Sequence, residues 1–220
     1  MKISVLGTPG FGHEDWVAPI KDRYTLCHLT ADEMIFDAMR KDTPAGFKAG
    51  KLLREGKEIP DELTAAILKA AAEKCPMGYV LTDMPKTVEQ AKSFEAVGEK
   101  LHGVIQMDVP DEVCISRATG RRVHLASGRQ YHVEQLPPKV EGKDDVTGDP
   151  LYHRSDDQPE AVKARIADFH ARMGPIERFY AEKEKMSHVD GTGDMYTVKS
   201  AMFKVLDPIA MKLKLWCKMM

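Results

Sequence analysis

The chain has 220 residues, a formal net charge of −2, and 43% hydrophobic and 30% charged residues, which is the profile of a soluble globular protein. So small a net charge provides no general attraction for nucleic acid or for an acidic membrane. No apolar run reaches the roughly 20 residues that a bilayer-spanning helix needs, so we expect neither partner.

The four cysteines are scattered along the chain and form no CxxC pair. This pattern argues for a reducing compartment and against both a zinc site and a disulfide framework. A strand-like run begins almost at the first residue, which leaves no room for a secretory signal. We therefore expect a cytoplasmic protein.

Short apolar runs alternate along the chain with longer stretches of helical periodicity. The predicted strands are residues 2–6, 25–29, 78–81, 103–109 and 187–189. The predicted helices are residues 32–40, 43–54, 61–72, 88–100, 111–118 and 160–185, with one more after the first strand. Alternation of this kind predicts an α/β fold in which helices cover a parallel sheet.

The stretch GTPGFGHEDW at residues 7–16 follows the first predicted strand. Gly7 and Gly12 keep the glycine spacing of the phosphate-binding loop GxxxxGK[ST], but His13, Glu14 and Asp15 follow Gly12. A carboxylate ~5 Å from a phosphate charge costs ~3 kcal/mol at an effective dielectric of ~20. The stretch therefore keeps the frame of a phosphate loop and loses its chemistry.

Helical periodicity stops between residues 120 and 157, where glycine, proline, histidine and basic residues are frequent. Pro137-Pro138 and Gly148-Asp149-Pro150 are turn signals. This composition favours a small β subdomain inserted into the main fold.

Several motifs together resemble an adenylate kinase of the long-lid type. They are GTPGFG, YVLTDMPKT, GRRVHLASGRQYHVEQLPPKVEGKDDVTG, RSDDQPEAVKARI and VDGT, in this order. The resemblance implies a P-loop NTPase-like core at residues 1–29, 60–119 and 158–220, with a monophosphate-binding segment at 30–59 and a lid at 120–157. It also implies transfer of a phosphoryl group from a nucleoside triphosphate to a monophosphate, with magnesium.

The resemblance also assigns site residues. Those matching the family's catalytic arginines are Arg121, Arg154 and Arg165. Those matching its nucleotide contacts are Gly7, Gly10, Gly12, His13, Lys57, Ile59, Lys86, Gln90, Arg117, Arg121, Tyr131 and Gly193. His124, Ser127, Asp144 and Thr147 match a hydrogen-bonded quartet that replaces a zinc site in some members, so no metal is expected to be bound by protein ligands alone.

The core departs from the family pattern. His13, Glu14 and Asp15 replace a lysine, a glycine and a threonine, and Thr82 replaces the aspartate that orders the magnesium waters. Lys86, Ala31 and Phe36 replace an arginine, a threonine and an arginine that contact phosphate. The losses therefore gather in the core and the monophosphate segment, whereas the lid positions are kept.

Three functions compete. The favoured one is a pseudoenzyme that serves as a structural or binding subunit of an assembly, such as a ciliary or flagellar axoneme. The alternatives are an active adenylate kinase that uses ATP, AMP and magnesium, and a sensor that binds ATP, ADP or AMP without chemistry. The basic, apolar tail at residues 209–220 is either the end of the last helix or a docking element for a protein partner.

Overall fold

The computed structural model describes residues 1–213, except for the side chains of residues 13–15. The chain divides into two compact units. The first contains Met1–Gly7, His13–Asp108 and the residues from Arg172 on, and the second contains Thr8–Gly12 and Val109–Ala171.

The first unit is built on a five-stranded parallel sheet with the order β2-β3-β1-β4-β7. The strands are β1 (Lys2–Gly7), β2 (Cys27–Leu29), β3 (Tyr79–Thr82), β4 (Gly103–Asp108) and β7 (Met186–Asp190). Ile3, Val80 and Ile105 are fully buried in the three central strands. Such continuous apolar runs are typical of parallel strands that are covered on both faces. The predicted α/β fold class is confirmed.

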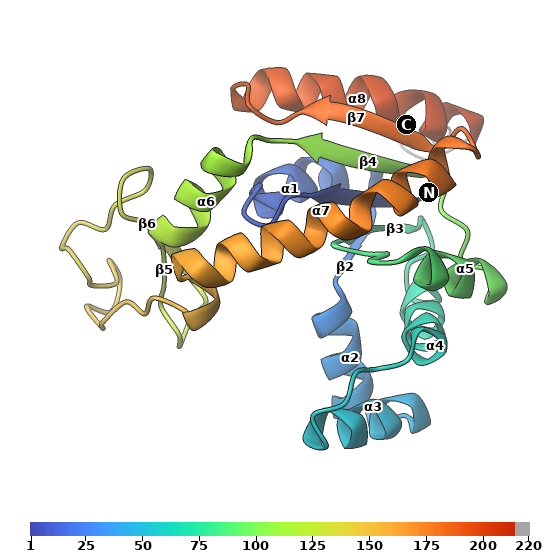
Figure 1. Ribbon diagram of the computed structural model, residues 1–220, viewed down its shortest axis with the longest axis horizontal. Helices are drawn as coiled ribbons and strands as arrows, with labels where there is room; N and C mark the ends of the chain where they lie inside the picture. The colour runs from blue at the N-terminus through green and yellow to red at the C-terminus, as the bar shows by residue number, and fades with distance from the viewer. Residues whose placement is uncertain (214–220) are drawn as a thin grey trace. The chain divides into compact units, whose positions relative to one another are not determined.

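The helices of this unit lie between the strands or, for α8, after the last strand (Figure 1). They are α1 (His13–Tyr24), α2 (Ala31–Arg40), α3 (Pro44–Arg54), α4 (Asp61–Ala72), α5 (Val88–Ala96) and α8 (Met195–Lys212). Helix α1 contacts β3 and α8, and α8 contacts β7. Helices α2, α3 and α4 contact one another and together form a helical segment between β2 and β3.

The prediction of a helix over residues 88–100 was too long. Helix α5 ends at Ala96, because Gly98 takes a φ of +88° and its N–H bonds to the carbonyl of Glu95. Glycine adopts this left-handed conformation without the steric cost of a side chain and is a common helix terminator. The Gly98 in the sequence was the signal that we did not weigh.

The second unit contains α6 (Asp111–Gly120), the antiparallel pair β5 (Arg121–Val123) and β6 (Gln130–His132), and the short 3₁₀ helix η1 (Ser155–Asp157). The last long helix, α7 (Pro159–Ala181), begins in this unit. Isolated bridges join Val123 to Tyr152, His132 to Leu136 and Lys143 to Pro150, and the rest of the stretch from 124 to 154 outside β6 consists of turns and irregular backbone. The expected small β subdomain is present, while the exact domain boundaries stay a prediction.

The prediction that the scattered cysteines form no disulfide framework was wrong. Cys27 and Cys75 form a disulfide, although 48 positions separate them in the sequence. Cys27 begins β2 and Cys75 follows α4, and the fold brings the two points together. The spacing of the cysteines could not predict this pairing, because it does not reveal which elements pack together. The inference of a reducing compartment from cysteine usage therefore loses its basis.

Within residues 1–213, no helix is long and apolar enough to cross a membrane.

Candidate functional site

The sheet of the first unit has its topological switch point at β1. The chain runs from β1 to β2 and β3 on one side and then crosses to β4 on the other. Ligands of open parallel sheets bind outside the carboxyl ends of the strands at this point. Gly7 ends β1 there, and Thr82 ends the neighbouring strand β3.

Two glycines of the loop after β1 adopt left-handed backbone conformations. Gly10 and Gly12 have φ values of +100° and +83°, and the Phe11 N–H donates to the carbonyl of Thr8 at 2.9 Å. Any side chain at Gly10 would overlap the backbone carbonyl of Cys114 in α6. Close packing of backbone on backbone is therefore one reason for a glycine at this position, independent of phosphate. The side chain of His13 lies outside the described residues, as do those of Glu14 and Asp15.

Arg117 also holds this loop. Its Nη1 donates to the carbonyl of Phe11 at 3.0 Å, from one turn before the end of α6. The predicted phosphate-binding arginine thus contacts the predicted phosphate loop within the second unit.

The position of the magnesium-ordering aspartate holds Thr82. Its side chain is 1% exposed, and its hydroxyl lies 3.0 Å from Nε2 of His28, which belongs to the neighbouring strand β2. Magnesium prefers carboxylate oxygens and retained waters in octahedral geometry. A single buried hydroxyl that is already paired with an imidazole does not fit that role. The residues at this position therefore do not fit the magnesium site of the family.

The neighbouring Asp83 does not restore the pattern. It follows the end of β3, has a left-handed φ of +58°, and is exposed, whereas Thr82 is buried. In the described part of the chain, no group of three or more His, Cys, Asp or Glu side chains could hold a metal ion.

The predicted monophosphate segment begins at Thr30, which is the N-cap residue of α2. The Thr30 hydroxyl accepts a hydrogen bond from the Glu33 N–H at 3.2 Å and caps α2. Asp32 and Glu33 lie in the first helical turn, where negative charge favours the helix dipole. Phe36, which replaces the arginine of the family, is 60% exposed.

Three of the predicted nucleotide-contact residues, Gln90, Lys57 and Ile59, differ in how firmly contacts within the protein hold their side chains. Gln90 accepts from the Lys86 N–H at 2.8 Å through Oε1 and donates from Nε2 to Asp61 at 3.1 Å. Lys57 pairs with Glu55 at 2.9 Å on the surface, and Ile59 is half-buried. Asp61 was not among the site residues predicted from the sequence, although it begins the predicted helix 61–72.

The three predicted catalytic arginines of the lid, Arg121, Arg154 and Arg165, gather around Asp156 and Asp157, and we call them the lid arginine cluster. Arg121 makes two hydrogen bonds of 2.9 and 2.6 Å to the fully buried Asp157. Arg154 Nε donates to Asp156 at 2.9 Å, and Arg165 Nη2 donates to the backbone carbonyl of the same residue at 2.7 Å. Three guanidinium groups thus meet two carboxylates.

One atom of this cluster has a further property. Nε of Arg165 is buried, and no described residue provides it with a hydrogen-bond partner. Among the described residues, three guanidinium groups therefore stand against two carboxylates, and one donor has no partner there.

The quartet expected in the lid is confirmed. His124 Nδ1 lies 2.7 Å from the Ser127 hydroxyl, and the Thr147 hydroxyl donates to Asp144 at 3.0 Å and lies 3.4 Å from His124 Nε2. The Arg129 guanidinium, which donates to Asp144 at 2.8 and 2.7 Å, holds the pKa of that carboxyl well below its usual value. His124 and Asp144, the two buried members of the quartet, are therefore paired by side chains of the lid itself.

Tyr131 belongs to the same network. Its hydroxyl donates to Asp144 and accepts from the Asp145 N–H, both at 2.9 Å, and the residue is buried. Its predicted place beside an adenine stays a prediction. Gly193 lies in an exposed turn before α8, and its predicted nucleotide contact also stays a prediction.

A parallel sheet with a glycine loop after β1, a helical segment between β2 and β3, and a small β insertion rich in arginine defines a P-loop-type nucleotide-binding protein. The family model described as "Adenylate kinase" matches residues 5–185. The chain therefore belongs to the adenylate kinase family, whose members bind adenine nucleotides and magnesium.

Proposed function

We propose that this protein is a catalytically impaired adenylate kinase that serves as a binding or structural subunit. The observation that carries the proposal is Thr82, whose buried hydroxyl pairs with His28 where the family places a magnesium-ordering aspartate. Removal of one preorganised charge-stabilising group typically lowers the rate ~10²–10³-fold. The changes at His13, Glu14 and Asp15 add a second, independent loss.

The lid arginine cluster supports continued binding of a polyphosphate. Its guanidinium groups are held in place by Asp156 and Asp157, so little conformational entropy is lost when an anion binds. The unused Nε–H of Arg165 gives such an anion one donor in addition. We propose ATP, ADP or AMP as the ligand.

A melting experiment tests nucleotide binding apart from chemistry. We expect millimolar ADP, without magnesium, to raise Tm by mass action, since a ligand at 100 times its Kd stabilises by about 2.7 kcal/mol. Arg154→Gln removes an exposed cluster member and should lower the shift, whereas Arg178→Gln, an exposed arginine of α7 outside the predicted site, should leave it unchanged. An unchanged Tm with every adenine nucleotide would contradict this part of the proposal.

The retained lid arginines also favour a second candidate, an active adenylate kinase with an altered phosphate loop. This candidate requires magnesium-dependent formation of ADP from ATP and AMP. The two candidates differ in one measurable quantity, the turnover number of the natural chain.

For the assembly, we propose a protein partner that binds residues 209–220, with the cytoplasm or a ciliary or flagellar axoneme as the setting. Met211 is 59% exposed in the last turn of α8, and Lys212 follows it. Residues 214–220 of this predicted docking element lie outside the described residues. A chain that ends at residue 213, which keeps α8 with its fully buried Ala210, should lose a stoichiometric partner in size-exclusion chromatography, while its melting temperature stays close to that of the full chain.

A further inference from the structure

The Cys27–Cys75 disulfide joins the two ends of the helical segment α2–α4. Cys27 is the first residue of β2 and Cys75 lies between α4 and β3, so all three helices lie between the two cysteines in the chain. The enclosed stretch contains residues 30–59, the predicted monophosphate segment. The bond therefore closes this segment at its base.

Strand β2 has few other attachments to the sheet. It is an edge strand of three residues, all of them half-buried, and among the described strands it pairs with β3 alone. By contrast, all four residues of β3 are buried. Elements with little buried surface at the edge of a fold are the first to open locally. The covalent bond at the first residue of β2 is therefore an important constraint on this strand.

Two features of the candidate site depend on the position of β2. His28, the residue after Cys27, places its Nε2 3.0 Å from the hydroxyl of Thr82. Thr30, which directly follows β2, accepts a hydrogen bond from the Glu33 N–H and caps α2. A displacement of β2 therefore changes both the Thr82 pair and the start of the predicted monophosphate segment.

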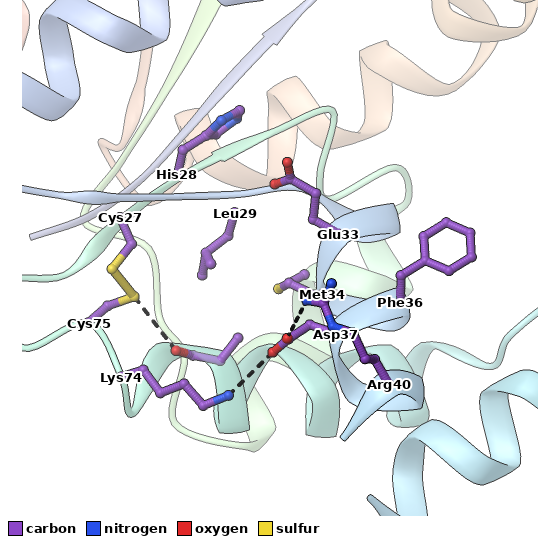
Figure 2. A pocket seen from close by; sticks show the side chains of 11 residues that line it. Cys27, His28, Leu29, Glu33, Met34, Phe36, Asp37, Arg40, Lys74 and Cys75 are labelled. Carbon is purple, nitrogen blue, oxygen red and sulfur yellow. Dashed lines mark hydrogen bonds and ion pairs between the residues drawn. A yellow bond between two sulfur atoms is a disulfide. The ribbon is translucent and has the colours of Figure 1, made fainter. Parts of the chain in front are cut away.

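The disulfide can be reached from a cavity. It forms part of the wall of a cavity of about 520 Å³ beside β2 (Figure 2). Cys27 is half-buried, whereas Cys75 is 7% exposed, so an incoming thiolate reaches the sulfur of Cys27 more easily. Accessible disulfides exchange with thiols more readily than buried ones. The position of the bond thus suits one that opens and closes in the folded chain.

The charges of the cavity favour no ionic class of reductant. Two acidic and two basic residues belong to its lining, namely Glu33, Asp37, Arg40 and Lys74. Asp37 already binds both cations, Arg40 at 2.9 Å and Lys74 at 3.4 Å. An uncharged reductant therefore meets a lining whose charges balance.

We propose that Cys27–Cys75 is a redox switch, which holds β2 and the first turn of α2 in place when oxidised and releases them when a dithiol reduces it. One thiolate of the dithiol attacks Cys27 Sγ, a mixed disulfide forms, and the bond to Cys75 breaks to give a thiolate. The second thiol of the dithiol, as a thiolate, then attacks the dithiol's own sulfur in the mixed disulfide and releases Cys27. The dithiol is oxidised to a disulfide, and the two cysteines take up the two protons that it loses. Exchange with a disulfide re-forms the bond by the same steps in reverse.

The test uses the full chain with its disulfide intact and dithiothreitol, an uncharged dithiol, as the reductant. Timed alkylation and mass spectrometry of peptides measure the labelling of Cys27, Cys75 and the buried Cys114. Labelling of the first two without Cys114 shows that the bond opens in the folded state. Hydrogen exchange of the backbone amides is then followed at short labelling times in the oxidised and the reduced chain.

We expect reduction to speed the exchange of amides in residues 27–33 by at least about tenfold, a conservative share of the stabilisation typical of a disulfide. Peptides from β1 and β4 should stay protected in both states. Cys27→Ser/Cys75→Ser should exchange as fast as the reduced chain without any dithiol. Cys217→Ser, which keeps the disulfide, should respond to dithiothreitol like the natural chain. Bis(2-hydroxyethyl) disulfide, an uncharged oxidant, should restore slow exchange.

Unchanged exchange in residues 27–33 after reduction would overturn the proposal. So would exchange that rises equally in β1 and β4, because the bond would then constrain the whole unit and not the segment. A disulfide that dithiothreitol reduces only together with labelling of Cys114 would also overturn it, as would Cys27 and Cys75 that stay free thiols in the presence of the oxidant.

None of these measurements involves a nucleotide, so the redox switch and the proposed function stand or fail separately. Only the consequence for a ligand, weaker binding of a monophosphate to the reduced chain, rests on the proposed function.

Discussion

At the scale of single residues, the lid and the sheet differ in how their polar side chains are used. Asp144 is surrounded by Arg129, Thr147 and Tyr131 and has a depressed pKa. Thr82 has one partner, His28, and occupies a place where a charge is expected. The lid thus pairs its buried charges internally, whereas the Thr82 position of the sheet holds a hydroxyl paired with an imidazole.

The depressed pKa of Asp144 predicts how lid stability depends on pH. A carboxyl whose pKa is lowered by folding stabilises the protein above its unfolded pKa of about 3.9, and this contribution is lost as pH falls toward the folded value. Asp144→Asn should therefore lower Tm by a constant amount above about pH 5, and the difference from the natural chain should shrink in more acidic solution. Thermal melts of both proteins from pH 2.5 to 8 check this. A difference that grows as pH falls would contradict it.

Cys114 should be chemically inert in the folded protein. Burial is the main reason that the pKa of its thiol is raised to about 11, against the lowering effect of Arg117 and with a smaller raising effect of Asp111. At pH 8 only about one thiol in a thousand is then the reactive thiolate. In a Cys217→Ser background with the disulfide intact, a chromogenic thiol reagent should react only after unfolding. Rapid reaction of one thiol in the native chain would be evidence against this burial.

At the scale of elements, glycines and caps decide where helices begin and end. Thr30 caps α2 and Gly98 ends α5, and both signals stand in the sequence. The boundaries of α4, Asp61 to Ala72, were predicted without error because Pro60 and two acidic residues mark its start. Helix ends of this kind can be predicted from the sequence, because the residues that determine them lie at the ends themselves.

The loop after β1 supplies a test of why its glycine is needed. Gly10→Ala should cost at least about 2 kcal/mol in free energy of unfolding, since a left-handed φ costs about 1–2 kcal/mol and the new methyl group also meets the Cys114 carbonyl. Gly128 also has a left-handed φ, but no heavy atom lies within 4 Å of a methyl group added there. Gly128→Ala should therefore lower the free energy of unfolding only by the cost of the left-handed φ. Denaturant unfolding measures both. Equal losses would mean that α6 yields to the methyl group.

The disulfide should stabilise the whole helical segment α2–α4. Closing a chain of 48 residues restricts the unfolded state and is worth up to about 4 kcal/mol. Cys27→Ser/Cys75→Ser should therefore lower the free energy of unfolding by about 2–4 kcal/mol relative to the oxidised chain. The same variant should match the natural chain once the latter is fully reduced. A variant as stable as the oxidised chain would contradict this account.

At the scale of the whole molecule, the fold class and the order of elements could be predicted, because apolar runs and helical periodicity alternate along the chain. The Cys27–Cys75 bond, the His28–Thr82 pair and the Gln90–Asp61 pair could not. Each joins residues that are more than 25 positions apart, and their proximity depends on how elements pack. The lid quartet was predicted only through the family resemblance, which supplied that long-range information.

We propose that changes in the sheet and the phosphate loop remove catalysis from an adenylate kinase fold. The most direct measurement is a coupled assay of ADP formation from ATP and AMP with magnesium. The natural chain is measured beside a variant that carries His13→Lys, Glu14→Gly, Asp15→Thr and Thr82→Asp. We predict no turnover above a heat-killed control for the natural chain and measurable turnover for the variant. Turnover of tens per second by the natural chain would contradict the account.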